Sequence, residues 1–222
     1  MKTKHQVHNL IILDESGSME SIKESIIEGL NEIIQTIKGI EKSYPEQQHF
    51  ISFVTFNGLG YKALHFNEPV AKLKVLNAKN YNPDASTPLY DTMGSSFIRL
   101  KKIVEPLKDY NVLVTILTDG EENASHEFSG LAIRNMINEL KQKRWTFTYI
   151  GADHDVESFA ASISVTNTMT FSKNRSSMNA MFEKDKMARA NYSEKISKNE
   201  NVSANFYEEP EGEENKGKDK KA

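Results

Sequence analysis

Residues 10–18 read Leu-Ile-Ile-Leu-Asp-Glu-Ser-Gly-Ser, and this stretch decides the fold. The segment from Val7 to Leu13 is apolar nearly throughout, which is typical of a strand buried on both faces of a parallel sheet. It ends in Asp14, Ser16 and Ser18, directly before a long helical pattern. A strand that ends in this way aims short oxygen side chains at one point, and such oxygens suit a small hard cation.

Two further loops that carry oxygen side chains follow in the sequence. Residues 86–91 read Ser-Thr-Pro-Leu-Tyr-Asp, and residues 117–121 read Leu-Thr-Asp-Gly-Glu. In a doubly wound sheet, ligands bind beyond the carboxyl ends of the strands. If the strands that end at Asp14 and Asp119 are neighbours, both carboxylates lie at the same sheet edge, and Thr87 can reach the same place.

These loops supply a set of candidate metal ligands: Asp14, Ser16, Ser18, Thr87 and Asp119. All five groups are hard oxygen donors and none is soft. Such a set selects Mg²⁺, Mn²⁺ or Ca²⁺ over zinc or copper.

Each motif also has a purely structural explanation. Ser16 or Ser18 could only cap the first helix, since Ser is a preferred N-cap residue. Thr87 could only precede a helix that Pro88 opens, and Asp119 could only belong to a turn. Three such motifs at three element ends, in the same order along the chain, favour a shared site over coincidence.

Apolar periodicity predicts the other elements. A helix follows the first strand, from about Met19 to Ile40, and Asn57-Gly58 predicts a hairpin. The remaining expected strands are 50–56, 61–66, 112–118, 146–150 and 168–171, and the remaining helices are about 88–104, 131–143, 156–163 and 177–192. This alternation predicts an α/β fold. Its sheet is doubly wound (Rossmann-like), six-stranded and mostly parallel, with one antiparallel edge strand and helices on both faces.

The composition excludes several classes of protein. The chain has 222 residues, a formal net charge of −3 and no cysteine, so disulfides and thiolate metal sites are ruled out. The acidic balance, without a basic strand studded with aromatic residues, argues against nucleic acid as a partner. No apolar run approaches the roughly 20 residues that span a bilayer, and no apolar segment precedes the first strand. We therefore expect a soluble, cytoplasmic protein with no membrane partner.

The composition changes near Ser193, where polar residues give way to an acidic run at 208–214 and a basic run at 216–221. So few apolar residues cannot offset the entropy of ordering. We expect one domain over 1–193 and a charged, disordered tail over 194–222.

The three motifs together resemble a known family. Asp14-x-Ser16-x-Ser18, then Thr87, then Asp119 match the metal-ion-dependent adhesion site of von Willebrand factor A domains, and the chain looks most similar to bacterial single-domain versions. The resemblance covers about residues 7–192. It implies that the serines and the threonine contact the cation directly or nearly so. It implies that the aspartates often act through water, and that an open position accepts an Asp or Glu from a partner protein.

We therefore expect a non-enzymatic, metal-dependent protein-interaction module. The alternative is a magnesium-dependent hydrolase of phosphate esters at the same site. A hydrolase needs a general base near the ion, and only Glu121, Glu122 and His154 are candidates. The sequence indicates neither the partner nor the oligomeric state.

Three other groups of polar residues carry weaker expectations. Glu121, Glu122 and Asn123 rim the site or form solvated surface, and Asp91 is a first-turn acid of its helix rather than a ligand. Asp153 or Asp155 caps the helix near Val156, although a second metal or a partner-contacting loop is conceivable there.

Overall fold

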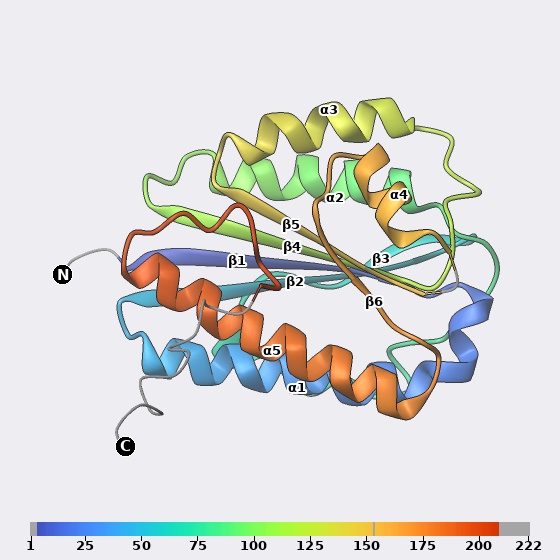
Figure 1. Ribbon diagram of the computed structural model, residues 1–222, viewed down its shortest axis with the longest axis horizontal. Coiled ribbons are helices and arrows are strands. Elements are labelled where there is room, and N and C mark those ends of the chain that lie inside the picture. Colours follow the sequence, from blue (N-terminus) through green and yellow to red (C-terminus); the bar gives the residue numbers. More distant parts are fainter. Residues whose placement is uncertain (1–3, 153, 209–222) are drawn as a thin grey trace, which may run out of the picture.

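The computed structural model describes residues 4–152 and 154–208. Its six strands form one sheet in the order β3-β2-β1-β4-β5-β6 (Figure 1). All neighbouring pairs are parallel except β2 and β3, which form the antiparallel hairpin expected from Asn57-Gly58. The predicted fold class, including the antiparallel edge strand, is confirmed.

The elements follow the expected order along the chain. The strands are β1 (His5–Asp14), β2 (Gln47–Asn57), β3 (Gly60–Pro69), β4 (Tyr110–Thr118), β5 (Trp145–Gly151) and β6 (Asn167–Thr170). The helices are α1 (Lys23–Ser43), α2 (Leu89–Val104), α3 (Gly130–Lys141), α4 (Val156–Ser162) and α5 (Arg175–Ser197), with short 3₁₀ turns η1 (Gly17–Ile22) and η2 (Val70–Lys72). The first predicted helix is thus divided into η1 and α1.

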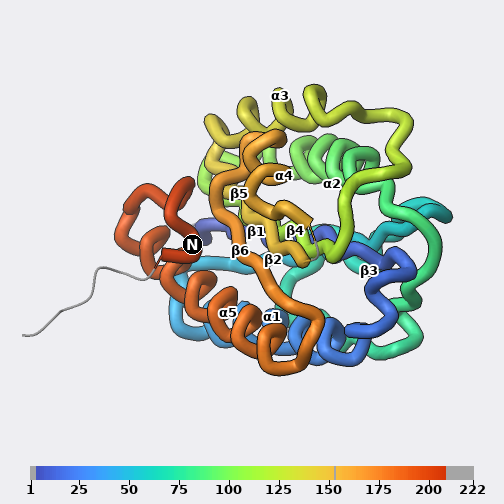
Figure 2. The backbone as a smooth tube through the Cα atoms, turned by 45° about the vertical axis from the view of Figure 1, so that its right-hand side comes forward, coloured from blue at the N-terminus to red at the C-terminus, as the bar shows by residue number. Residues whose placement is uncertain are grey.

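Helices cover both faces of the sheet, as Figures 1 and 2 show from two directions. Helices α1 and α5 lie side by side on one face, and α2, α3 and α4 lie on the other. Strand β1 serves both layers, because Ile11 and Leu13 join the core under α1 and α5 while Leu10 and Ile12 join the other core. This is why its sequence is apolar nearly throughout. No helix within the described ranges has the length and apolar character needed to cross a membrane.

One buried ion pair lies between α5 and the sheet. Arg189 donates to Asp185 (Nε to Oδ2, 2.6 Å) one turn earlier in the helix. Its other nitrogens donate to Thr115 Oγ1 on β4 (2.7 Å) and to Asn9 Oδ1 on β1 (3.4 Å). Both charged side chains are buried, so each depends on these partners.

The folded part of the chain extends past the boundary expected after residue 193. Helix α5 continues to Ser197, and Phe206 is buried against Val7 and Tyr192. Thr146 Oγ1 also donates to the carbonyl of Val202 (3.0 Å). The prediction therefore placed the start of the disordered tail too early in the sequence. A few spaced apolar residues, Phe206 among them, suffice to dock the segment that follows α5. Most of the charged run, 209–222, lies outside the described residues.

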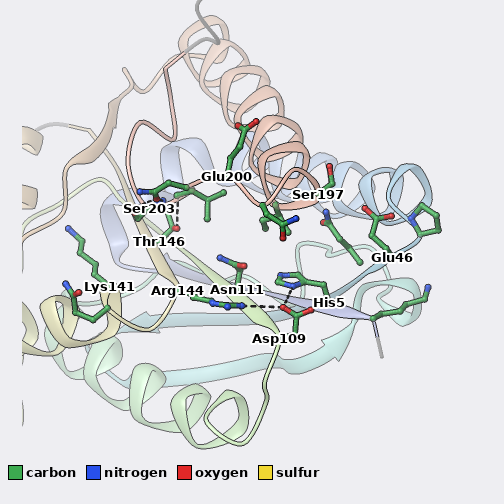
Figure 3. Close-up of a pocket in the computed structure, with 18 residues that line it drawn as sticks. His5, Glu46, Asp109, Asn111, Lys141, Arg144, Thr146, Ser197, Glu200 and Ser203 are labelled. Carbon is green, nitrogen blue, oxygen red and sulfur yellow. Dashed lines mark hydrogen bonds and ion pairs between the residues drawn. The ribbon is translucent and has the colours of Figure 1, made fainter. Parts of the chain in front are cut away.

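A cavity of about 900 Å³ lies at the amino end of the sheet, between the starts of the strands and the segment after α5 (Figure 3). Polar side chains line it, among them His5, Asp109, Arg144 and Ser203. Asp109 accepts from His5 Nδ1 (2.8 Å) and from Arg144 Nη1 (3.3 Å). This cavity is at the opposite end of the strands from the residues that the sequence singled out.

Candidate functional site

The predicted site lies where the strand order reverses direction, between β1 and β4. The two strands are parallel neighbours, with Leu13 aligned to Leu117, so Asp14 lies beside Thr118 at their carboxyl ends. Thr118 Oγ1 donates to Asp14 Oδ2 (2.6 Å), and the Ser16 backbone N–H donates to Oδ1 (2.7 Å). Asp14 is fully buried and held at both oxygens. Ligands bind at such a reversal point in open α/β sheets.

The serines of the first loop connect the two strand ends. Ser18 Oγ donates to Asp119 Oδ1 (2.6 Å), and the hydroxyls of Ser16 and Ser18 are 3.2 Å apart. Ser16 occupies the N-cap position of η1, but its side chain makes no capping hydrogen bond. The capping explanation for these serines therefore does not account for where their hydroxyls lie.

Thr87 approaches the same place from the loop before α2. Its side chain is buried, and a Cβ built on Gly120 would lie 3.9 Å from Thr87 Oγ1. Asn123 holds this loop, because its Oδ1 accepts from the Thr87 N–H (3.0 Å) and its own N–H donates to the Thr87 carbonyl (3.3 Å). The structure thus brings together all five residues that the sequence singled out.

The carboxylates of Asp14 and Asp119 lie close together in this site, so their negative charges repel each other. Burial raises the pKa of the Asp14 carboxyl, and hydrogen bonds from Thr118 and Ser16 lower it in part. The negative charge of Asp119 raises it further. A positive charge placed between these groups would stabilise their ionised forms.

Lys173 supplies one such charge, and the sequence analysis missed it. Its ammonium lies 2.7 Å from Asp119 Oδ2, while the Asp119 side chain is 0% exposed and that of Lys173 is 23% exposed. Lys173 belongs to the loop between β6 and α5, 54 positions after Asp119 along the chain. No local pattern marks this residue, so only the fold could reveal the contact.

A second group of missed residues braces the first loop. Glu15 is buried, and its Oε1 accepts from Lys62 Nζ (2.7 Å) and from the Asn82 N–H (2.5 Å). Tyr81 donates its hydroxyl to the carbonyl of Asp14 (2.7 Å). Burial and the nearby carboxylates raise the pKa of Tyr81, so it remains a donor. The bonds from Tyr81 and Asn82 fix the loop that carries Ser16 and Ser18 against the loop that carries Thr87, and the bond from Lys62 ties the first of these loops to β3.

The residues expected to rim the site have mainly structural contacts. Glu122 accepts from the Tyr90 N–H at the start of α2 (2.8 Å) and from the N–H groups of Ala124 and Ser125. Asp91 is a first-turn acid of α2, as expected, and it accepts from three backbone N–H groups over residues 126–128 (2.8 to 2.9 Å). Glu121 is exposed.

The loop after β5 is also explained by local structure. Asp155 caps α4 by accepting from the Ser158 N–H (3.1 Å), as expected. His154 lies within hydrogen-bonding distance of the Ala152 carbonyl (2.6 Å) and the Tyr149 hydroxyl (3.1 Å). Asp153 lies outside the described residues.

The donor chemistry agrees with a hard cation. Within residues 4–152 and 154–208, no group of three or more His, Cys, Asp or Glu side chains could hold a metal ion. The predicted set contains two carboxylates and three hydroxyls, so most of its ligands are neutral oxygens. Such a set fits Mg²⁺, Mn²⁺ or Ca²⁺.

Comparison with solved structures identifies the fold as that of von Willebrand factor A domains. The chain is similar to a von Willebrand factor type A protein from Catenulispora acidiphila (TM-score 0.57, 15% identity, covering 84% of this chain and 43% of that one). It is also similar to proximal thread matrix protein 1 from the mussel byssus (0.56, 15%, 82% and 45%). A third similar structure is the pilus adhesin SpaC from Lactobacillus rhamnosus GG in an open conformation (0.55, 13%, 90% and 31%).

These likenesses confirm the expected resemblance at the level of the fold. The chain spans less than half the length of each of the three structures. By sequence, neither a family model nor a curated protein matches. The function therefore has to be argued from the site.

Proposed function

We propose that this protein is a non-enzymatic interaction module that binds a partner protein through a divalent cation, Mg²⁺ or Mn²⁺ in the first instance. Asp14, Ser16, Ser18, Thr87 and Asp119 would hold the cation. The observation that carries the proposal is their convergence from three loops at the reversal point of the sheet. Because the sequence contains no cysteine, we also propose that the protein acts in the cytoplasm.

The chemistry of the site explains why a partner would be needed. A bound divalent cation supplies Lewis acidity and a centre of positive charge. Asp14 already accepts hydrogen bonds at both oxygens, so it is positioned to act through its neighbours or through water rather than as a freely moving ligand. When the two aspartates act through water, the three hydroxyls are the only direct ligands of this set, and an Asp or Glu side chain of a partner can complete the coordination shell of the cation.

The alternative, a phosphate-ester hydrolase, finds little support in the candidate bases. Glu122 accepts hydrogen bonds from backbone N–H groups at the start of α2 and in its own loop, and both ring nitrogens of His154 have protein neighbours. Glu121 is left, and it is exposed. A general base must lie within hydrogen-bonding reach of the water or hydroxyl that it activates.

Calorimetric titration of Mn²⁺ and Mg²⁺ tests the cation site. Replacement of Ser16 and Ser18 together by Ala should abolish measurable binding, because both hydroxyls are lost from the centre of the site. The matched control replaces Ser197 and Ser203 by Ala, two serines that line the cavity at the other end of the sheet. Unchanged cation affinity in the Ser16 and Ser18 variant would exclude this site.

A pull-down with magnesium, compared with one in chelator, tests the interaction. Proteins retained only with magnesium are candidate partners, and an acidic residue of such a partner should be essential for its binding. Thr87→Ala should weaken binding of that partner more than binding of the cation, because Thr87 is on a different loop from the serines. Phosphatase activity that depends on Asp14 would instead support the hydrolase.

A further inference from the structure

Lys173 is placed beside the candidate cation site by the start of α5. Its backbone neighbours are fixed: Asn174 caps α5 by accepting from the Ser177 N–H (2.9 Å), and Ser177 Oγ accepts from the Ser172 N–H (2.9 Å). Phe171 is buried, and its N–H donates to the Gly151 carbonyl (3.0 Å). The backbone of this loop is therefore held, while the long Lys173 side chain reaches from it to Asp119.

The contact engages the second oxygen of Asp119. Oδ1 accepts from Ser18, and Oδ2 lies 2.7 Å from the Lys173 ammonium. A buried carboxylate without a counter-charge is strongly unfavourable, and the ammonium provides that charge. The same oxygen belongs to the group that would hold a divalent cation. An ammonium and a divalent cation repel each other, so contact of one with the Asp119 carboxylate disfavours contact of the other.

We propose that Lys173 is an internal competitor of the divalent cation, an ammonium that pairs with Asp119 and must be displaced for the cation to bind. This inference rests on the proposed function and adds its regulation. The exchange requires no backbone movement, because the Lys173 side chain is 23% exposed and can turn towards solvent. The ion pair then has two consequences. It stabilises the cation-free protein, and it lowers the cation affinity by the free energy needed to break it.

The test replaces Lys173 by Met, which keeps the length of the apolar stem and removes the charge. Mn²⁺ affinity, measured by calorimetry, should rise about tenfold or more, since each tenfold change corresponds to about 1.4 kcal/mol. In chelator the same variant should melt at a lower temperature than the wild type, because Asp119 loses its counter-charge. Lys173→Gln, which can still donate a hydrogen bond, serves as a second neutral variant.

Two controls separate this role from a general effect of charge. Lys173→Arg keeps the positive charge and should keep the wild-type Mn²⁺ affinity to within a few-fold. Lys184→Met removes one positive charge at an exposed position of α5 and should leave the affinity unchanged. A gain of affinity in Lys184→Met equal to that in Lys173→Met would overturn the proposal.

The outcomes distinguish this inference from the proposed function. If the wild type binds Mn²⁺ and both neutral variants bind it equally or more weakly, Lys173 is not a competitor, although the cation site stands. If only the neutral variants bind, the competition is stronger than proposed and the inference is supported. If neither the wild type nor any variant binds, the cation site itself is wrong and the inference falls with it.

Discussion

The two ends of the sheet hold similar polar side chains in opposite environments. At the carboxyl end, Asp14, Thr118 and Asp119 are buried and contact one another through short hydrogen bonds and Ser18. At the amino end, Asp109 and Arg144 are 60% and 57% exposed and line a cavity of about 900 Å³. This cavity is therefore far from the buried carboxylates, whose removal from water is energetically unfavourable. In this molecule, buried carboxylates mark the candidate site better than open volume does.

The largest expected effect of a single substitution concerns what holds the amino end together. Phe206→Ala should lower the free energy of unfolding by about 3 kcal/mol, because it removes a buried ring from its contacts with β1 and α5. The cation affinity of the folded protein should stay the same. Urea unfolding and Mn²⁺ calorimetry on one preparation measure both. Val75→Ala, at an exposed position, is the control and should change neither quantity.

The next effect compares one aspartate from each end. Asp119→Ala should weaken Mn²⁺ binding by at least about 100-fold, since even the loss of an indirect partner of a metal ligand costs about 10–100-fold. Asp109→Ala removes an exposed carboxylate at the amino end and should leave Mn²⁺ affinity unchanged. Similar losses in both variants would mean that net charge, rather than position, governs cation binding.

The amino half of the sheet should also respond to acid. His8 and His49 are buried, and burial lowers the pKa of each to about 4. Between pH 6.5 and pH 4 the unfolded chain therefore binds more protons than the folded one. The stability from these neutral rings is complete above pH 6.5 and is lost as the pH falls towards 4. At pH 5 the loss is roughly 2 kcal/mol for each histidine.

Urea unfolding at pH 7.5 and pH 5 measures this loss. His49→Gln should shrink the difference between the two pH values by roughly 2 kcal/mol, because one of the two groups no longer titrates. His126→Gln, at an exposed position, should leave the difference as it is. A pH difference that survives in a variant lacking both His8 and His49 would assign the acid sensitivity to other groups.

The smallest effect compares two buried threonines. Thr118→Val removes the donor to Asp14 and should weaken Mn²⁺ binding roughly tenfold. Thr146→Val removes the donor to the Val202 carbonyl at the amino end and should not change it. Thr146→Val should lose about 1 kcal/mol of stability, since it breaks one hydrogen bond, and Thr118→Val should lose more, because Thr118 Oγ1 also accepts from the Gly120 N–H (3.1 Å). Equal cation affinities in the two would show that Asp14 needs no help from Thr118.

Much of this arrangement could be predicted from local patterns. The strand from Val7 and the hairpin at Asn57-Gly58 carry strong signals, and the parallel order of the strands follows from the helices between them. The five candidate ligands could be found because each follows or precedes an element end. Ligands at such ends meet once the sheet forms.

The rest depended on contacts between distant residues. Lys173 and Lys62 reach the site from loops and strands whose own sequences give no hint of it. The boundary at residue 193 failed for a related reason. Polar residues dominate after it, yet the sheet leaves an apolar patch around Val7 and Leu113 that Phe206 fills. Amino-acid composition alone does not reveal that the sheet has an apolar surface which a residue later in the chain must cover.

The buried Arg189 has a further consequence for the geometry of the site. Its guanidinium can meet Asp185, Thr115 and Asn9 in only one axial position of α5, because a shift by one residue moves the helix about 1.5 Å and turns it by about 100°. Arg189 lies 14 residues after Arg175, the first residue of α5, a distance of roughly 21 Å along the axis. Helix α5 is thus fixed along its axis at two places, at Arg189 near the middle of the sheet and at the loop of Lys173, where the Phe171 N–H donates to the Gly151 carbonyl. Replacement of Arg189, which is remote from every candidate ligand, would remove one of these two fixed points and leave the loop of Lys173 as the remaining one that sets the axial position of α5 relative to Asp119.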